Sequence, residues 1–235
     1  MPPIKTRGEP LASRHGVCDG LTVRKYTLVG VPGSGKSTHG ARLTHDFDLV
    51  RISVGDILRW HVKHHTKIGA RVREGMAAGR LAGDTLVEAV MRDRLEQHDW
   101  NHGFVIDGFP RNRRQAEFFL ETYDIDAVIY LEISDPQVRE RVLARRRCSR
   151  CGTDYSLLES GPRQEGACDS CGGRLVARDD DTPEALTTRI QDYRRNIGPV
   201  LELLRRKAPV FVIDASGDPD TVQAEIRTRL GLDDG

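Results

Sequence analysis

The sequence predicts an α/β fold of three layers, in which a five-stranded parallel sheet lies between two layers of helices. Two observations support this prediction. Five short apolar runs rich in β-branched residues recur along the chain, and they show little alternation with polar residues, as is typical of strands buried on both faces of a parallel sheet. Stretches with helical periodicity separate these runs, so that strands and helices alternate.

The five predicted strands lie at residues 26–29, 49–52, 104–106, 127–131 and 210–213. A helix is expected to begin at Asp84 as its cap, because an apolar stripe with helical spacing follows it: Leu86, Val87, Val90, Met91 and Leu95. Asp135 and Thr182 each precede a proline, the usual N-cap and N1 combination, and predict two more helix starts. Two polar stretches, 53–83 and 144–181, interrupt this order and indicate insertions.

Composition and charge exclude several classes of protein. Of the 235 residues, 38% are hydrophobic and 30% charged, with no long apolar run, which excludes a disordered chain and a membrane span. Lys and Arg number 36 and Asp and Glu 35, so that we expect no nucleic-acid partner and no membrane partner. The odd cysteine count of five argues against a disulfide-stapled secreted protein and favours the cytoplasm. Residues 1–22, which contain Cys18 as an expected free thiol, carry no signal-peptide pattern and are expected to be a disordered extension of a core at 23–235.

The segment Gly30-Val31-Pro32-Gly33-Ser34-Gly35-Lys36-Ser37-Thr38 directly follows the first predicted strand. Its spacing is that of a P-loop, in which glycines allow the backbone N–H groups to wrap a phosphate. Lys36 is expected to reach the outer phosphates, and the hydroxyl of Ser37 or Thr38 to hold Mg²⁺. The order of strand, loop and helix argues against a chance match with a flexible turn. The loop predicts nucleotide binding without defining the reaction.

Two further segments, 52–59 and 107–111, follow the second and third predicted strands. The carboxyl ends of parallel strands open onto one crevice, so that both segments should face the P-loop. Arg59 and Arg111 would then supply two cations for a second phosphate, and Asp107 could orient Mg²⁺. Taken singly, each has an ordinary alternative as a surface arginine or a turn residue.

Together, the motifs resemble the adenylate kinase family of nucleoside monophosphate kinases over about residues 24–232. They are Gly30–Thr38, then 52–59, 79–84 and 107–115, followed by Arg141, Arg145, Arg178 with Asp180 and Asp181, and Arg189. The resemblance implies a monomeric P-loop kinase that transfers a phosphoryl group from MgATP to AMP, giving two ADP. It also implies that residues 53–82 form an acceptor-binding clamp and residues 144–181 a lid over ATP.

The resemblance further implies a role for individual residues. The expected catalytic side chains are Lys36, Arg111, Arg145, Arg178 and Arg189. The expected ATP contacts are Gly33, Ser34, Gly35, Lys36, Ser37, Thr38, Arg141, Arg145 and Tyr155, of which Arg141, Arg145 and Tyr155 would lie near the adenosine. The expected AMP contacts are Val54, Arg59, Arg80, Leu81, Ala82, Gly108, Phe109, Pro110, Arg111, Gln115, Arg178 and Arg189, with Gln115 at the base. Ser37 and Asp107 are expected to orient Mg²⁺.

The other four cysteines form two CxxC pairs, Cys148 with Cys151 and Cys168 with Cys171, each followed by a glycine. This spacing suits a structural, tetrahedral zinc site, while free thiols, two disulfides or an iron–sulfur cluster are the alternatives. Zinc-bearing lids with this spacing occur in some bacterial adenylate kinases, so the resemblance also implies zinc. His61, His64 and His65 could share a metal, but are expected to be solvated positions on a helix.

Two departures from the family pattern leave the acceptor open. Ser37 stands where the family usually has glycine, and Val54 where it usually has a threonine beside the acceptor base. The loss of that hydroxyl can change base discrimination, so that CMP, UMP or GMP is an alternative acceptor to AMP. A zinc-ribbon protein that binds nucleotide or nucleic acid without phosphoryl transfer is a further alternative. Arg59, Arg111 and Gln115 argue against it, because such a protein needs no acceptor clamp.

Overall fold

The computed structural model describes residues 24–98, 102–158 and 161–232. Five strands form a parallel sheet in the order β2-β3-β1-β4-β8, which confirms the predicted fold class. These strands are β1 (Lys25–Gly30), β2 (Val50–Ser53), β3 (Phe104–Asp107), β4 (Ala127–Glu132) and β8 (Val210–Asp214). The expected extension at residues 1–22, with Cys18, lies outside the described residues.

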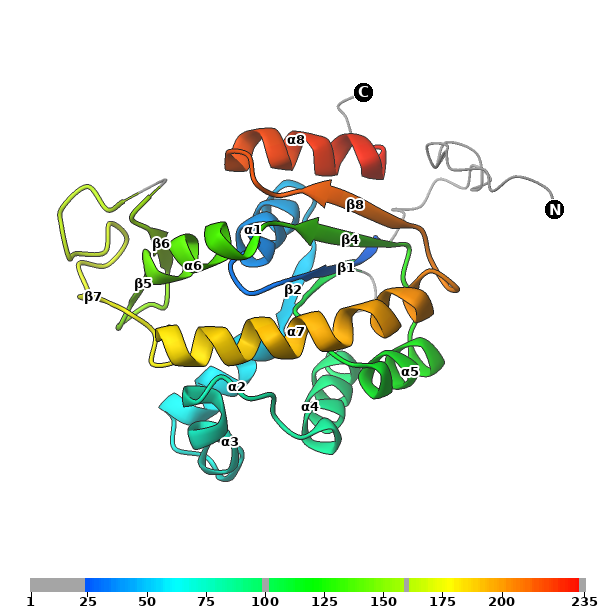
Figure 1. Cartoon of the computed structure of the whole chain (residues 1–235), viewed down its shortest axis with the longest axis horizontal. Helices are drawn as coiled ribbons and strands as arrows, with labels where there is room; N and C mark the ends of the chain where they lie inside the picture. Colours follow the sequence, from blue (N-terminus) through cyan, green and yellow to red (C-terminus); the bar gives the residue numbers. More distant parts are fainter. Residues whose placement is uncertain (1–23, 99–101, 159–160, 233–235) are drawn as a thin grey trace.

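Helices cover both faces of this sheet (Figure 1). They are α1 (Lys36–Asp46), α4 (Asp84–Glu96), α5 (Arg113–Thr122), α6 (Asp135–Leu143), α7 (Pro183–Leu204) and α8 (Pro219–Leu230). Alternate residues of β4 pack into separate apolar clusters: Val128 and Tyr130 join the cluster that α4 and α5 cover, and Ile129 and Leu131 join the one that α1 and α8 cover. This two-sided burial explains why the strands read as continuous apolar runs.

The helix starts are predicted to within one residue. Thr182 caps α7, and its hydroxyl accepts a hydrogen bond from the backbone N–H of Ala185, as expected. The predicted caps at Asp84 and Asp135 are wrong by one residue, because the N-caps of α4 and α6 are Gly83 and Ser134. Both aspartates are instead the first helical residue, where a carboxylate interacts favourably with the helix dipole.

Two smaller units project from the edge of the sheet at which the parallel strands end (Figure 1). One is the pair of helices α2 (Val54–Lys63) and α3 (Lys67–Ala77). The other is a three-stranded antiparallel sheet of order β6-β5-β7, formed by β5 (Arg145–Cys148), β6 (Asp154–Ser156) and β7 (Leu175–Val176). The sequence did not predict these short strands. No helix among the described residues is long and apolar enough to cross a membrane.

Candidate active site

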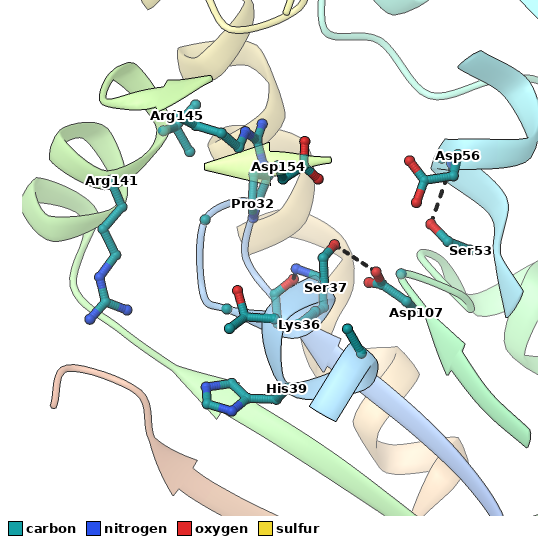
Figure 2. Close-up of a pocket in the computed structure, with 18 of the residues that line it drawn as sticks. Pro32, Lys36, Ser37, His39, Ser53, Asp56, Asp107, Arg141, Arg145 and Asp154 are labelled. Carbon is teal, nitrogen blue, oxygen red and sulfur yellow. Dashed lines mark hydrogen bonds between the residues drawn. The ribbon is translucent and has the colours of Figure 1, made fainter. Parts of the chain in front are cut away.

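A cleft of about 630 Å³ opens at the carboxyl ends of the parallel strands, between the two projecting units (Figure 2). This volume is typical of a small-molecule site. The cleft collects many of the predicted site residues: Gly33, Gly35, Lys36, Ser37, Thr38, Arg59, Asp107, Arg111, Arg141, Arg145, Tyr155, Arg178 and Arg189. An adjoining pocket is lined by Val54, Arg80, Leu81, Ala82, Gly108 and Gln115. Ser34 and Phe109 are instead buried, and Phe109 packs edge-on against Phe119.

The P-loop connects β1 to α1 and turns back over the start of that helix. Gly33 and Gly35 have φ values of +83° and +91°, a left-handed conformation that a side chain would oppose. The Lys36 ammonium donates hydrogen bonds of 2.8 Å to the carbonyl oxygens of both Gly30 and Val31. The lysine is thus held at the inner surface of the loop, next to the N-terminus of α1, where an anion is favoured.

Electrostatics at Lys36 favour an anionic ligand. The pKa of Lys36 is lowered to about 7, mainly by burial and also by the positive charges of Arg111, Arg189 and Arg145, against the opposing effect of Asp107. A lysine held among arginines gains a favourable interaction when a phosphate arrives.

Asp107 ends β3 beside the P-loop and is almost fully buried. Its carboxylate accepts a hydrogen bond of 2.7 Å from the Ser37 hydroxyl, as Figure 2 shows, and one of 2.9 Å from the Arg51 guanidinium. A hydroxyl and a carboxylate side by side are the oxygen donors that Mg²⁺ prefers, so that the side chains present fit this ion.

Most of the arginines in the cleft are paired with carboxylates. Arg145 binds Asp181 through two nitrogens, at 2.5 and 2.9 Å, and Arg189 contacts both Asp180 and Asp181 at 3.2 Å. In addition, the Arg178 guanidinium donates to Asp154. These ion pairs connect α7, and residues 178–181 before it, to strands β5 and β6.

Asp56 of α2 is the centre of a second cluster. Its carboxylate accepts hydrogen bonds from Arg51 at 3.0 Å, Arg59 at 2.9 Å and Arg147 at 3.0 Å. Although burial acts in the opposite direction, these arginines hold the pKa of Asp56 far below its usual range. Arg147 belongs to β5, so that this carboxylate links the two projecting units across the cleft.

Arg111 differs from the carboxylate-paired arginines of the cleft. Its guanidinium donates to the carbonyl oxygen of Gly108 at 2.7 Å, and no described carboxylate forms an ion pair with it. Burial by surrounding atoms lowers the pKa of Arg111 to about 10, and the charges of Arg189 and Arg59 add to this effect. The nearby carboxylates Asp107 and Asp180 offset this effect only in part, so that the surroundings of Arg111 favour an anion.

The adjoining pocket has an apolar part and a cationic part. Apolar side chains form most of its wall: Val54, Leu58, Met76, Leu81, Ala82 and Val87. Arginines provide the charge: Arg59, Arg80, Arg111 and Arg189. The Gln115 amide, which is 1% exposed, lies in this pocket. A flat base attached to a phosphate suits such a pocket.

On the other side of the P-loop, the side chains of Arg141 and Tyr155 have partners of their own. The Arg141 guanidinium donates to the carbonyl oxygens of Ala215 at 2.7 Å and Gly217 at 3.0 Å, and so contacts the loop after β8. The Tyr155 hydroxyl accepts from the backbone N–H of Asp169 at 2.8 Å and donates to a cysteine sulfur. Both residues line the cleft. Arg141 also holds the loop after β8, and Tyr155 holds the segment that contains Asp169.

The four cysteines of the projecting unit that contains β5, β6 and β7 come together, with ligand atoms within 4.8 Å of one another. The distances from Cys148 to Cys171 and from Cys151 to Cys168 are both 3.5 Å between sulfurs. Zn–S bonds of about 2.3 Å in a tetrahedron place sulfurs about 3.8 Å apart, so the group fits a zinc ion. No histidine joins a metal-binding group among the described residues; His61 is bonded to Thr66, and His64 stacks on Trp60.

Removal of zinc, or the substitution Cys168→Ser, is expected to unfold the lid. Apart from the cysteines, its apolar cluster contains only Leu175 and Tyr155, which is too little to hold the lid without the metal. We expect about one zinc ion per chain by mass spectrometry of metals, a lid that becomes sensitive to protease, and a loss of activity of at least about tenfold. Cys18→Ser is the matched control and should retain zinc. Full activity in zinc-free protein would contradict this role.

Several residues of the cleft were missed by sequence reasoning: Arg51, Asp56, Arg147 and Asp154. One signal was available for Arg51, because it is a charged residue within an otherwise apolar predicted strand. No such signal was available for Arg147, because β5, in which it shares a face with Arg145, was not among the predicted strands. Asp56 lies within the motif at 52–59 but was given no role, and for Asp154 the sequence gave no comparable signal.

Comparisons with known proteins agree with this geometry. A family model described as adenylate kinase matches residues 28–208. The chain is 36% identical over 208 residues to an adenylate kinase of Archaeoglobus fulgidus, covering 86% of this chain and 96% of the relative. It is 37% identical over 211 residues to one of Methanocella arvoryzae, with 88% and 98% covered. An adenylate kinase of Syntrophotalea carbinolica is 38% identical over 212 residues, with 88% and 98% covered.

Proposed function

The chain belongs to the adenylate kinase family, and from that premise we propose which of its side chains perform the family's reaction, the reversible transfer of a phosphoryl group from MgATP to AMP. It is thus an ATP:AMP phosphotransferase. We assign the P-loop, with Lys36, to the phosphates of ATP, and the adjoining pocket to AMP. The observation that supports this assignment is the pair of cations Lys36 and Arg111, which line one cleft, Lys36 in the P-loop and Arg111 where the cleft meets the adjoining pocket.

The reaction needs alignment and charge stabilisation rather than a general base. A phosphate oxygen of AMP is already ionised near neutral pH, so that it can attack the terminal phosphorus of ATP directly. Lys36, Arg145, Arg178 and Arg189 are proposed to surround the phosphoryl group in transfer, where their charges stabilise its oxygens. Arg59 and Arg111 are proposed to hold the AMP phosphate in line, with Gln115 at the base.

Mg²⁺ bound with ATP neutralises part of the phosphate charge. Ser37 and Asp107 are the side chains proposed to orient it, because their oxygens already lie together. Arg51 donates to the same Oδ2 atom of Asp107 as Ser37 does, and so helps to hold this carboxylate in place.

On the ATP side, we propose that the adenosine is bordered by Arg141, Arg145 and Tyr155. The phosphates of ATP are proposed to lie against the P-loop residues Gly33, Ser34, Gly35 and Thr38. Residues 53–82 are proposed to act as the acceptor clamp and residues 144–181 as a lid that excludes water, since water competes with AMP as nucleophile. We propose a monomer on the basis of the family likeness and a cytoplasmic location on the basis of the odd cysteine count. The balanced charge gives no general electrostatic reason to bind nucleic acid or membrane.

A coupled assay with MgATP and each of AMP, CMP, UMP and GMP tests this function. AMP should be phosphorylated with the highest kcat/KM. If ATP binds but no monophosphate is phosphorylated, the phosphotransferase assignment fails. Preference for another monophosphate would instead correct the acceptor.

Binding of MgATP at pH 8 is expected to take up protons through Lys36. Its pKa of about 7 means that most of this lysine is neutral at pH 8, and phosphate oxygens favour the charged form. Binding therefore raises the pKa, and the affinity for MgATP should fall as the pH rises above about 7. Calorimetry in buffers of different ionisation enthalpy measures the uptake.

Two variants separate this contribution from the titration of ATP itself. Lys36→Met should remove the Lys36 part of the uptake. Lys207→Met, at a lysine bonded to Leu120 and Asp124, should leave it intact. Equal uptake in the wild type and in Lys36→Met would contradict the prediction.

A further inference from the structure

Asp84 belongs to one of the sequence motifs but has no part in the proposed function so far. It is the first residue of α4, and its Oδ1 atom accepts a hydrogen bond of 2.8 Å from Nε2 of Gln115. The same oxygen accepts a bond of 2.7 Å from the side-chain amide of Asn112, which caps α5. At the other end of the Gln115 amide, Oε1 accepts a bond of 2.9 Å from the backbone N–H of Arg111. Both ends of this buried amide are therefore bonded to protein.

These partners allow only one orientation of the Gln115 amide. A carboxylate only accepts hydrogen bonds and a backbone N–H only donates them. Rotation of the amide by half a turn would set Oε1 against the Asp84 carboxylate and the NH₂ group against the Arg111 N–H. Two like groups would then face each other in a buried place, which is costly. The hydrogen-bond partners therefore fix which end of the Gln115 amide carries the oxygen and which the nitrogen.

The fixed amide faces a pocket with otherwise apolar or charged walls. Gln115 is the only uncharged polar side chain among the described residues that line it. Val54 offers no hydroxyl that could supply a second polar contact. After its two bonds to protein, the amide retains one N–H donor on Nε2 and one acceptor site on Oε1. A ligand in this pocket therefore meets a donor and an acceptor whose order is fixed.

Bases differ in how they match this order. Adenine and cytosine present an exocyclic amine as donor beside a ring nitrogen that accepts. Guanine, hypoxanthine and uracil present a carbonyl oxygen beside a ring N–H, which is the reverse order. We propose that Asp84 is a positioning residue for the acceptor base: by fixing the Gln115 amide, it selects monophosphates of amino bases over those of keto bases. This inference rests on the proposed function, which places the acceptor base at Gln115.

AMP and inosine 5′-monophosphate test the inference, because the two differ in shape only at the amino or keto group. The wild type should prefer AMP in kcat/KM by at least about a hundredfold. In Asp84→Ala, we expect water to take the place of the carboxylate. Because water both donates and accepts hydrogen bonds, the Nε2 end of the Gln115 amide no longer has a partner that opposes rotation of the amide. The AMP to inosine monophosphate ratio should fall by about tenfold, mainly through KM for the monophosphate, while KM for ATP stays within about twofold. The CMP to UMP ratio should fall in parallel.

Control variants separate this positioning role from a general effect of the helix. Asp84→Asn should retain the ratio within about threefold, because a carboxamide oxygen can accept the same two bonds. Asp135→Ala removes the corresponding first-turn carboxylate of α6 and should leave the ratio unchanged. If Asp84→Ala does not fold, Asp84→Ser, which is too short to reach Gln115, replaces it.

The possible results are distinct. A folded Asp84→Ala with an unchanged ratio, or an equal loss in Asp84→Asn, would overturn the inference while the enzyme remains an AMP kinase. Failure of the wild type to phosphorylate any monophosphate would overturn the proposed function itself.

Discussion

Lys36→Met is expected to lower kcat by about three orders of magnitude, the largest effect of any single substitution in the cleft. The ammonium of Lys36 lies within the P-loop, and methionine keeps the apolar stem but removes the charge that stabilises the transferred phosphoryl group. Rapid-quench measurement of a single turnover with saturating MgATP and AMP reports the chemical step directly.

The fold should survive this substitution. Two hydrogen bonds to loop carbonyls are lost, at about 1 kcal/mol each, while a partly buried charge is removed as well. The free energy of unfolding should therefore change by no more than about 2 kcal/mol. Lys207→Met serves as the matched control with full activity. A turnover in Lys36→Met within about tenfold of the wild type would contradict the role of Lys36.

Arg111→Ala is expected to raise KM for AMP by about a hundredfold and to lower kcat as well, because a charge-assisted bond to phosphate is lost. KM for ATP should change much less. Arg113→Ala is the matched control, since Arg113 lies two positions along the chain, is exposed and pairs with Glu117. Steady-state kinetics with AMP as the varied substrate measures the effect.

The stability of Arg111→Ala should change much less than its activity. The lowered pKa of Arg111, about 10, means that the empty protein disfavours this charge. Removing it relieves repulsion from Arg189 and Arg59, and the midpoint of thermal unfolding should not fall by more than about 2 °C. A large loss of stability with little change in KM for AMP would show that Arg111 is structural rather than a phosphate ligand.

The features that could be predicted from the sequence are those encoded by residues near one another in the chain. The apolar runs gave the sheet because burial on both faces leaves a local pattern, and the P-loop gave the nucleotide site because its glycines and Lys36 are adjacent. The cysteine pairs gave the metal group for the same reason. The loss of apolar periodicity at residues 53–83 and 144–181 predicts two insertions for the same local reason.

The features that escaped prediction depend on contacts between distant segments. Arg147 and Asp56 are 91 positions apart and meet only because the lid and α2 face each other across the cleft. The lid strands β6 and β7 have three and two residues, too short for a pattern of period two to be recognised. The cap at Ser134 was missed because Asp135 and Ser134 are both good N-caps, and sequence alone does not separate neighbours of equal propensity.

The pairing of the cleft arginines with Asp56, Asp154, Asp180 and Asp181 has a consequence for competition among anions. A phosphate that enters must displace carboxylates that are tethered to the protein and therefore always present at high local concentration. Chloride or a single inorganic phosphate displaces them poorly, because it gains one contact where several are exchanged. A nucleotide pair with its several phosphates can exchange many of these partners at once. The internal carboxylates are therefore expected to compete with small anions for the arginines that they pair with, and so to favour a ligand with several phosphates.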